Sequence, residues 1–196
     1  MCFHLPNKLE KLKDKKSGLI IHHWDTDGLA CAGMLYSYFR DLNPKLELEL
    51  ITPKIGNYFL TQSELIQIKK AKYDFVITAD INFPPDVIDE LKKVNDYIYI
   101  FDHHHQKKIH GVHYVNEKYP GCTWVLTEYL KIDPCLLGVL GIVGDKEEKI
   151  LEDDHYASII NEVVKENQIT FNDLLLMRRY IDSLYMVQDY KNIKNT

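Results

Sequence analysis

An aspartate followed by three histidines, Asp102 to His105, comes directly after an alternating apolar run at residues 97–101. Carboxylates and imidazoles are common ligands of divalent metal ions in proteins. At the end of a strand, consecutive side chains fan out, so that one imidazole can bind a metal while its neighbour faces a substrate. An acid beside a histidine orients the ring and raises its basicity. One such histidine would be an ordinary polar core residue, but three in a row beside an acid favour a metal site.

A second cluster, His23, Asp25 and Asp27, lies between a short apolar run at residues 18–22 and a helical pattern. Two carboxylates two residues apart repel each other unless a positive group lies beside them. A DxD pair by itself is more often explained by helix capping, because aspartates accept from the free N–H groups at a helix start. The full HxDxDG pattern is more specific, since Gly28 allows a close backbone approach. We therefore expect metal ligands here.

Two further aspartates, Asp80 and Asp145, follow apolar runs at residues 75–78 and 136–143. Each alone has a simpler explanation, as a turn cap before Pro85 and as a surface turn. Together, however, four strand ends would deliver five aspartates and at least three histidines to the edge of a sheet where ligands bind. Carboxylates with one or two imidazoles fit Mn²⁺ or Mg²⁺. Two cations would offset the repulsion among so many acids.

The elements that must position these residues alternate between strands and helices. Strands are expected at residues 18–22, 46–51, 73–78, 97–101 and 113–115, and helices at 29–41, 63–72, 85–94 and 123–131. This alternation predicts βαβ units, hence an α/β fold with a mostly parallel sheet flanked by helices. Helical patterns at 152–166 and 172–185 predict a helical appendage over residues 146–196, after a metal-binding domain over residues 1–150.

Composition is that of an ordinary globular protein. The 196 residues are 45% apolar, which is enough for a core, and the net charge of −5 offers no global basic surface for nucleic acid. The four cysteines form no CxxC pair, so nothing indicates disulfides or a zinc ribbon. No signal peptide is recognisable and no run reaches the ~18 apolar residues of a membrane span. We expect a cytoplasmic protein with no membrane partner.

The ordered set HWDTDG, TAD, DHH and GD, over about residues 18–150, resembles the DHH phosphoesterase superfamily. The HxDxDG form of the first motif is most similar to RecJ-like archaeal members. The superfamily includes RecJ-type single-strand exonucleases, family II inorganic pyrophosphatases, oligoribonucleases and cyclic-dinucleotide phosphodiesterases. The resemblance implies a phosphoesterase that uses two metal ions, Mn²⁺ or Mg²⁺.

The resemblance also implies a role for each motif residue. Asp80 falls at the position that bridges the two ions. His104 falls where a histidine faces the scissile phosphate, and Asp102 falls where an acid supports it, so these two would form the catalytic pair. The implied ligands are His23 and Asp25 for the first ion, and Asp27, His103 and Asp145 for the second.

The chain departs from full-length relatives of this type in one respect. They carry a second domain, DHHA1, with a GGHxxAAG-like substrate-binding motif, and this sequence contains no such motif. Residues 186–191 resemble the connector where that domain would begin, so the chain is expected to be either a fragment or a one-domain member. Arg178 and Arg179 could bind substrate phosphate at the cleft, or they could be solvent-facing residues of the last helix.

The expected function is therefore nuclease-like hydrolysis of phosphodiester bonds in single-stranded nucleic acid or a short oligonucleotide. Two alternatives remain open. A non-catalytic scaffold or binding module on the same fold predicts erosion of the acidic set, whereas every motif acid is present here. A hydrolase of small phosphoesters, such as a pyrophosphatase or a cyclic-dinucleotide phosphodiesterase, is the other; a pyrophosphatase would need a basic second domain.

Overall fold

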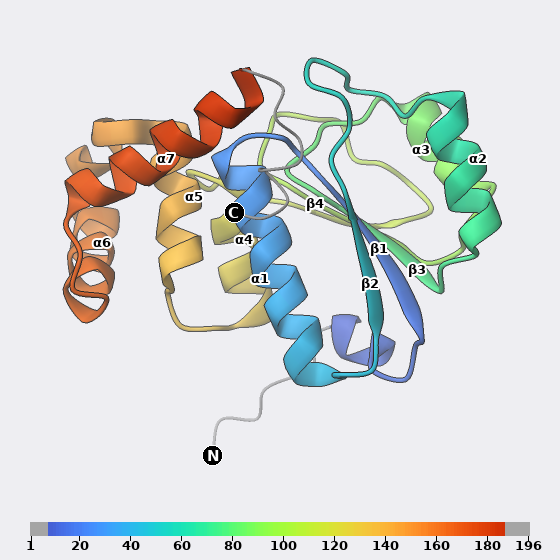
Figure 1. Ribbon diagram of the computed structural model, residues 1–196, viewed down its shortest axis with the longest axis horizontal. Coiled ribbons are helices and arrows are strands. Elements are labelled where there is room, and N and C mark those ends of the chain that lie inside the picture. The colour runs from blue at the N-terminus through green and yellow to red at the C-terminus, as the bar shows by residue number, and fades with distance from the viewer. Residues whose placement is uncertain (1–7, 187–196) are drawn as a thin grey trace.

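The computed structural model describes residues 8–186 and contains one five-stranded sheet in the order β2-β1-β3-β4-β5 (Figure 1). Every neighbouring pair of strands is parallel. This confirms the predicted α/β fold. The strands are β1 (Ser17–His22), β2 (Glu47–Ile51), β3 (Phe75–Ala79), β4 (Ile98–Asp102) and β5 (His113–Asn116).

Helices cover both faces of the sheet (Figure 1). The α-helices are α1 (Thr26–Leu42), α2 (Gln62–Ala71), α3 (Pro85–Lys92), α4 (Cys122–Leu130), α5 (Leu136–Lys146), α6 (Asp154–Glu166) and α7 (Phe171–Met186), and the short 3₁₀ helices are Lys8–Leu12 and Glu147–Glu152. None of the helices in the described part of the chain is both long and apolar enough to cross a membrane.

Side chains of the central strands alternate between two cores. In β1, Leu19 and Ile21 pack in the cluster that includes residues of α2 and α3, whereas Ile20 packs in the cluster that includes residues of α1 and α4. All three are fully buried. Strands covered on both faces read as continuous apolar runs, which is why residues 18–22 and 75–78 are recognisable from the sequence.

The apolar run at residues 136–143 is the N-terminal part of helix α5 rather than a strand. The expectation that Asp145 follows a strand is therefore wrong, because an apolar run of this length fits a buried helix as well as a buried strand. Glycines let this helix pack closely against its neighbours. A Cβ atom on Gly141 would lie 2.3 Å from Oδ1 of Asp27, so only glycine fits there.

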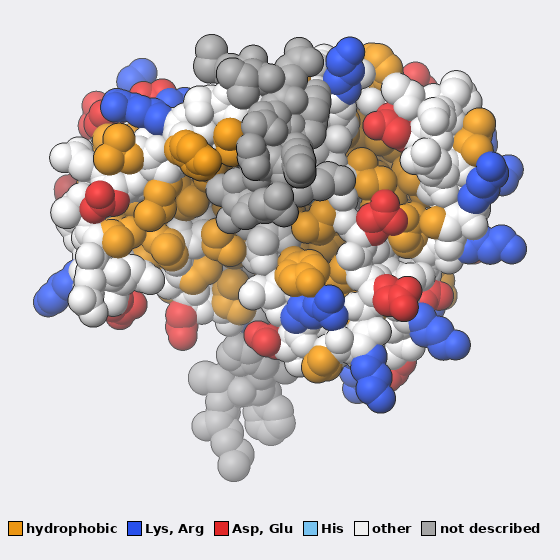
Figure 2. Space-filling model, viewed as in Figure 1, with side chains coloured by type: hydrophobic (Ala, Val, Ile, Leu, Met, Phe, Trp, Pro, Cys, Tyr) orange, Lys and Arg blue, Asp and Glu red, His pale blue; other side chains and the backbone are white. Residues whose placement is uncertain are grey.

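Helices α6 and α7 are present as the patterns in the last fifty residues predict, and they share a core with α5 that includes Val139, Ile160 and Leu174. Thr170 caps α7 through a reciprocal pair, in which the N–H of Asp173 donates to Thr170 Oγ1 and the N–H of Thr170 donates to Asp173 Oδ2. An apolar groove of about 600 Å³ lies between α1, α5 and α7. Figure 2 shows apolar side chains gathered on the face formed by α5 and α7.

Candidate metal centre

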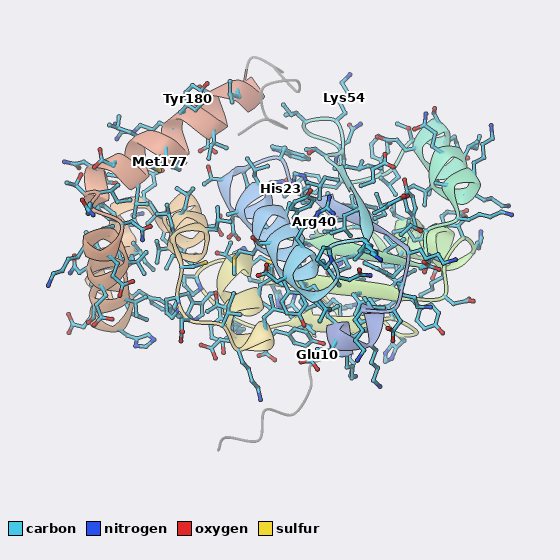
Figure 3. The ribbon with its side chains drawn as sticks, turned by 60° about the horizontal axis from the view of Figure 1, so that its bottom comes forward. Glu10, His23, Arg40, Lys54, Met177 and Tyr180 are labelled. Carbon is cyan, nitrogen blue, oxygen red and sulfur yellow. The ribbon has the colours of Figure 1, made fainter. Side chains whose placement is uncertain are left out.

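Three neighbouring strands deliver their polar residues to one edge of the sheet, as the sequence predicts. His23 and Asp25 follow β1, Asp80 follows β3, and His103 follows β4. These strands are adjacent in the order β1-β3-β4, so their carboxyl ends lie side by side. His23 is labelled in Figure 3, near the start of α1. The carboxyl edge of a parallel sheet is the usual ligand-binding edge of such folds.

Asp80 has a left-handed backbone, with φ at 56°. Few residues other than glycine adopt this conformation, and it is retained where the surrounding structure imposes it, often at functional sites. The backbone N–H of Asp80 donates to the carbonyl oxygen of Phe101 at 2.9 Å, which ties the turn to β4. The side chain is 1% exposed. The turn therefore holds the carboxylate inside the protein between β1 and β4.

The two oxygens of Asp80 face two different sets of side chains. Oδ2 lies 3.8 Å from Nδ1 of His23, and this nitrogen lies 2.6 Å from Oδ2 of Asp25. Oδ1 lies 3.4 Å from Nε2 of His103 and 3.8 Å from Nδ1 of His104. Asp80 is thus the one carboxylate, among those described, that belongs to two of the residue groups able to hold a cation.

His103 joins the two remaining acids. Its Nε2 atom lies 3.0 Å from Oδ2 of Asp145 and 3.9 Å from Oδ2 of Asp27. Its Nδ1 atom lies 3.2 Å from the carbonyl oxygen of Tyr119, which can only accept, so Nδ1 carries the proton. That tautomer leaves the Nε2 lone pair for a metal ion, an arrangement common among metal-binding histidines.

Hydrogen bonds from the first residues of α4 hold the carboxylate of Asp27 in place. Its carboxylate accepts from the backbone N–H of Cys122 at 2.5 Å, from the N–H of Thr123 at 3.1 Å and from the Thr123 hydroxyl at 2.8 Å. The side chain is 1% exposed. These bonds hold the acid in one orientation, toward the site.

Asp25 caps a helix and also faces the candidate site. Oδ1 accepts from the N–H of Gly28 at 3.0 Å and so caps α1, while Oδ2 faces His23. Gly28 is needed for this geometry, because a Cβ atom there would lie 2.5 Å from Cβ of His23. Capping and metal binding are therefore compatible at Asp25.

Asp102 orients His104. One oxygen, Oδ1, accepts from Nδ1 of His104 at 2.8 Å and from the N–H groups of His103 and His104 at 2.8 and 3.1 Å. Asp102 is fully buried, whereas the side chain of His104 is 48% exposed. His104 also lines a cavity of about 350 Å³ together with His23, Tyr58, Asp80 and Asn82. With Nδ1 bound to Asp102, Nε2 is the nitrogen available to a substrate.

The crowding of acids shifts their pKa values. Burial, and then the charges of Asp145 and Asp25, raise the pKa of Asp27 to about 6. Burial, and then the charges of Asp27 and Asp25, raise the pKa of Asp80 well above its ordinary value. Burial lowers the pKa of His103, but the hydrogen bond to Asp145 and nearby charges outweigh it and raise that pKa. Buried like charges disfavour ionisation, and bound cations reverse this effect.

The chemistry of the site fits divalent metal ions. Both carboxylate oxygens of Asp80 and Nε2 of His23 are buried without a hydrogen-bond partner, which is rare for polar atoms inside proteins. Oxygen-rich sets with one or two imidazoles suit Mn²⁺ or Mg²⁺. The groups whose ligand atoms lie within 4.8 Å of one another are His23, Asp25 and Asp80; Asp27, His103 and Asp145; and Asp80, His103 and His104.

Arg178 lies near the site but its charge is paired. Its Nε atom lies 2.8 Å from Asp182, and its terminal nitrogen lies 3.2 Å from Glu147. Asp182 also accepts from the hydroxyl of Thr26 at 2.9 Å. Helix α7 thus contacts Thr26, which lies between Asp25 and Asp27 in the sequence. The two bonded residues are 156 positions apart, so the sequence alone does not indicate this contact. Arg179 is exposed on α7, and a phosphate contact by either arginine stays a prediction.

Residues 18–160 match the family described as "DHH family, N-terminal domain". No curated protein sequence matches the chain. Among solved structures, exonuclease RecJ bound to manganese superposes with a TM-score of 0.54 at 20% identity, over 72% of this chain and 44% of that one. The DHH domain of a protein described as a member of a family of ribosomal proteins gives a TM-score of 0.68 at 16% identity, over 89% and 49%.

CDC45 from Entamoeba histolytica gives a TM-score of 0.54 at 16% identity, over 83% of this chain and 36% of that one. The chain therefore spans less than half the length of each of these three proteins. At such identities the likeness shows the fold alone, and roles must be argued from the site.

Proposed function

Since the chain belongs to the DHH family, we propose that it is a divalent-metal-dependent phosphoesterase that hydrolyses phosphodiester bonds. The observation that carries this proposal is the buried carboxylate of Asp80, which accepts no hydrogen bond and lies between two sets of acids and imidazoles. Such a group is costly inside a protein unless a positive charge accompanies it. Manganese in the related RecJ structure supports the same type of ion here.

We assign the two ions to the two sets that Asp80 joins. The proposed ligands are His23, Asp25 and Asp80 for one Mn²⁺ or Mg²⁺ ion, and Asp27, Asp80, His103 and Asp145 for the other. When bound, such a pair stabilises charge on phosphoryl oxygens and lowers the pKa of an attacking water. The chain itself contributes rigidity, because Asp27 and Asp25 are fixed by backbone N–H donors.

His104 is the proposed catalytic histidine. Its Nδ1 is held by Asp102, so the ring presents Nε2 to the cavity beside Asp80. In its protonated form, which the hydrogen bond to Asp102 favours by raising the pKa of His104, Nε2 donates a hydrogen bond to a phosphate oxygen that gains charge during the reaction, or its proton to the leaving oxygen. Asp102 is a positioning residue, since it acts through His104 rather than on the substrate.

The proposed substrates are single-stranded nucleic acid or short oligonucleotides, which the likeness to an exonuclease supports. The likeness to CDC45 keeps a non-catalytic scaffold as the second candidate. The complete acidic set favours the enzyme, because a scaffold gains nothing from burying the Asp80 carboxylate without a hydrogen-bond donor.

A small substrate panel tests the proposal. Purified protein with Mn²⁺ is given bis-p-nitrophenyl phosphate, a short RNA, a 5′-labelled DNA single strand and pyrophosphate. We expect hydrolysis of the diesters and little hydrolysis of pyrophosphate. Strict dependence on added metal, with loss of activity in Asp80→Ala, would attribute the activity to this site. An inactive protein that binds Mn²⁺ normally would favour the scaffold.

On long single strands we expect weak and distributive hydrolysis. Tight binding requires several phosphate contacts and stacking platforms along a groove, whereas this chain has a net charge of −5. With substrate in excess, product ladders should shorten gradually across all strands, and affinity should fall steeply with salt. Fully degraded strands beside untouched ones would show processive hydrolysis and contradict this expectation.

Asp182→Ala is expected to weaken Mn²⁺ binding by about 2- to 10-fold, the value of one net hydrogen bond. The reason is that Asp182 holds Thr26, which stands between two proposed ligands. Calorimetric titration measures the affinity, with Glu162→Ala, at an exposed position of α6, as the control. Asp182→Asn keeps an acceptor for Thr26 and should bind like the wild type. Equal affinities for Asp182→Ala and the wild type would show that α7 does not support the site.

A further inference from the structure

One wall of the cavity beside the metal-binding residues is aromatic. Tyr58, in the loop between β2 and α2, lines this cavity and yet remains 47% exposed. Its ring is stacked toward His23, with centroids 5.9 Å apart and an interplanar angle of 26°. The ring of Trp24 meets it edge-on at 5.2 Å. A large aromatic side chain is thus held on its inner side and accessible on its outer side.

This exposure has no explanation in the packing of the fold. Tyr58 belongs to none of the three apolar clusters that form the core, and the next residue, Phe59, is 50% exposed as well. Of the two, Tyr58 lines the polar cavity, and aromatic side chains are common in the walls of ligand pockets.

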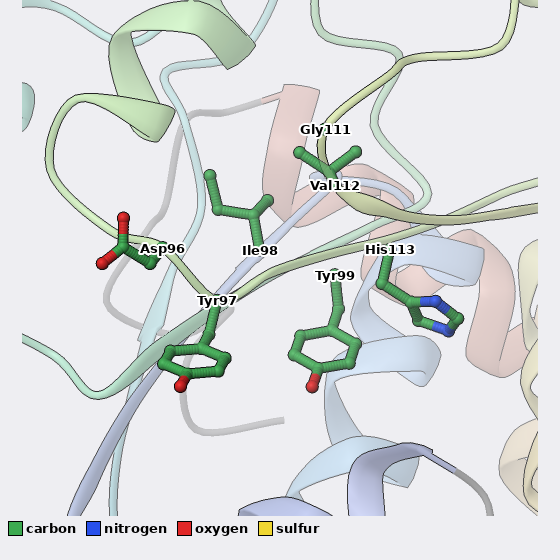
Figure 4. A pocket seen from close by; sticks show the side chains of 7 residues that line it. All are labelled: Asp96, Tyr97, Ile98, Tyr99, Gly111, Val112 and His113. Carbon is green, nitrogen blue, oxygen red and sulfur yellow. The ribbon is translucent and has the colours of Figure 1, made fainter.

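A tyrosine at the opposite end of the sheet shows the contrast. Tyr97 is 51% exposed and lines a separate cavity of about 220 Å³ at the start of β4 and β5 (Figure 4). The ammonium group of Lys15 lies 4.6 Å from its ring centre. No group of metal-binding side chains in the described residues includes a residue that lines this cavity. Tyr97 is therefore a matched exposed tyrosine away from the candidate site.

The size and lining of this cavity suit a small substrate that contains a planar ring. The cavity of about 350 Å³ is at the lower end of the range for ligand pockets, about 300–1,000 Å³. Its polar wall contains Asp80 and His104, where the proposed function puts a phosphate, and its aromatic wall is Tyr58. A planar ring attached to that phosphate through a sugar would reach the aromatic wall.

We propose that Tyr58 is a stacking platform for a nucleobase next to the scissile phosphate. This inference rests on the proposed function and narrows its substrate class to nucleoside-bearing phosphodiesters, as opposed to pyrophosphate or base-free esters. Stacking of a base on an aromatic side chain tolerates any base, since every base has a π-face. Loss of one such contact weakens binding by roughly 5- to 150-fold.

Matched substrates with and without a base test the platform. The first is a 5′-phosphorylated thymidine dinucleotide. The other two carry a tetrahydrofuran abasic residue in place of one or the other thymidine. For Tyr58→Ala we expect KM for the full dinucleotide to rise by roughly 5- to 150-fold with kcat nearly unchanged. For one of the two abasic dinucleotides, KM should be high already and insensitive to the substitution. Tyr58→Phe and Tyr97→Ala should behave like the wild type.

The outcomes separate the platform from the enzyme. The stacking role is refuted if the wild type hydrolyses all three dinucleotides with the same KM. It is also refuted if Tyr58→Ala raises KM by the same factor for all three. In both cases the proposed phosphoesterase activity stands. If neither the dinucleotides nor bis-p-nitrophenyl phosphate is hydrolysed, the proposed function fails. In that case, the affinity for the dinucleotide can still be measured by the quenching of tryptophan fluorescence in the presence of Mn²⁺. Equal affinities of the wild type and Tyr58→Ala would show that Tyr58 does not stack on a base.

Discussion

Asp80→Ala is expected to abolish the binding of both divalent ions, and with it the hydrolysis of phosphodiesters. Asp80 is the carboxylate whose two oxygens face His23 on one side and His103 on the other. On the proposed assignment, its removal would take a ligand from each ion and negative charge from between the two cations. Mutation of residues that only support a metal ligand typically lowers metal affinity by about 10- to 100-fold. For Asp80→Ala we therefore expect the affinity for Mn²⁺ to fall by more than about 100-fold.

Calorimetric titration of Mn²⁺ into Asp80→Ala and Asp25→Ala measures this difference. Asp25 is a proposed ligand of one ion only and is partly exposed, so its removal should leave the second site filled. Equal and mild losses in the two variants would show that Asp80 is a turn residue without a bridging role.

The metal-free protein offers an independent check on Asp80. Burial and neighbouring acids raise the pKa of Asp80, so an ionised carboxylate there opposes folding near neutral pH. Asp80→Asn removes this charge at nearly constant shape. Its melting temperature without metal should therefore equal or exceed that of the wild type, while its metal affinity falls. A large loss of stability would indicate a structural role instead.

His104→Ala is expected to keep both ions and to lose turnover by about 100-fold or more, the typical contribution of a residue that stabilises transition-state charge or transfers a proton. The reason is that His103 points its Nε2 at Asp27, Asp80 and Asp145, whereas His104 is bound to Asp102 and lines the cavity.

Measuring both the metal stoichiometry and kcat of His104→Ala tests this prediction. His105→Ala is the matched control, because His105 is the next residue, also a histidine, and exposed. If His104→Ala empties a metal site, then His104 is a ligand, and the group Asp80, His103 and His104 would be the third coordination set.

The positions of the acids at the ends of β1, β3 and β4 could be predicted because each strand is a continuous apolar run that stops at a polar residue. The convergence of these ends follows from parallel pairing alone. The same logic failed for Asp145, since the run before it is a helix, and a buried helix and a buried strand are equally apolar over so few residues. Asp145 nevertheless reaches His103, because glycines let α5 approach α1.

Other features of the site depend on contacts that a linear sequence does not contain. The left-handed backbone of Asp80 is set by its tie to Phe101, and the link from Thr26 to Asp182 joins opposite ends of the chain. The loop residue Tyr58 gave no signal, because the short run from Tyr58 to Leu60 has neither the period of a helix nor that of a strand. Such residues become recognisable only when the fold brings them beside the strand ends.

The most direct measurement is anomalous scattering from a crystal soaked in Mn²⁺. The account predicts two manganese peaks on opposite sides of the Asp80 carboxylate, one beside His23 and Asp25 and the other beside Asp27, His103 and Asp145. An ordered but empty cluster of these residues at saturating Mn²⁺ would contradict it.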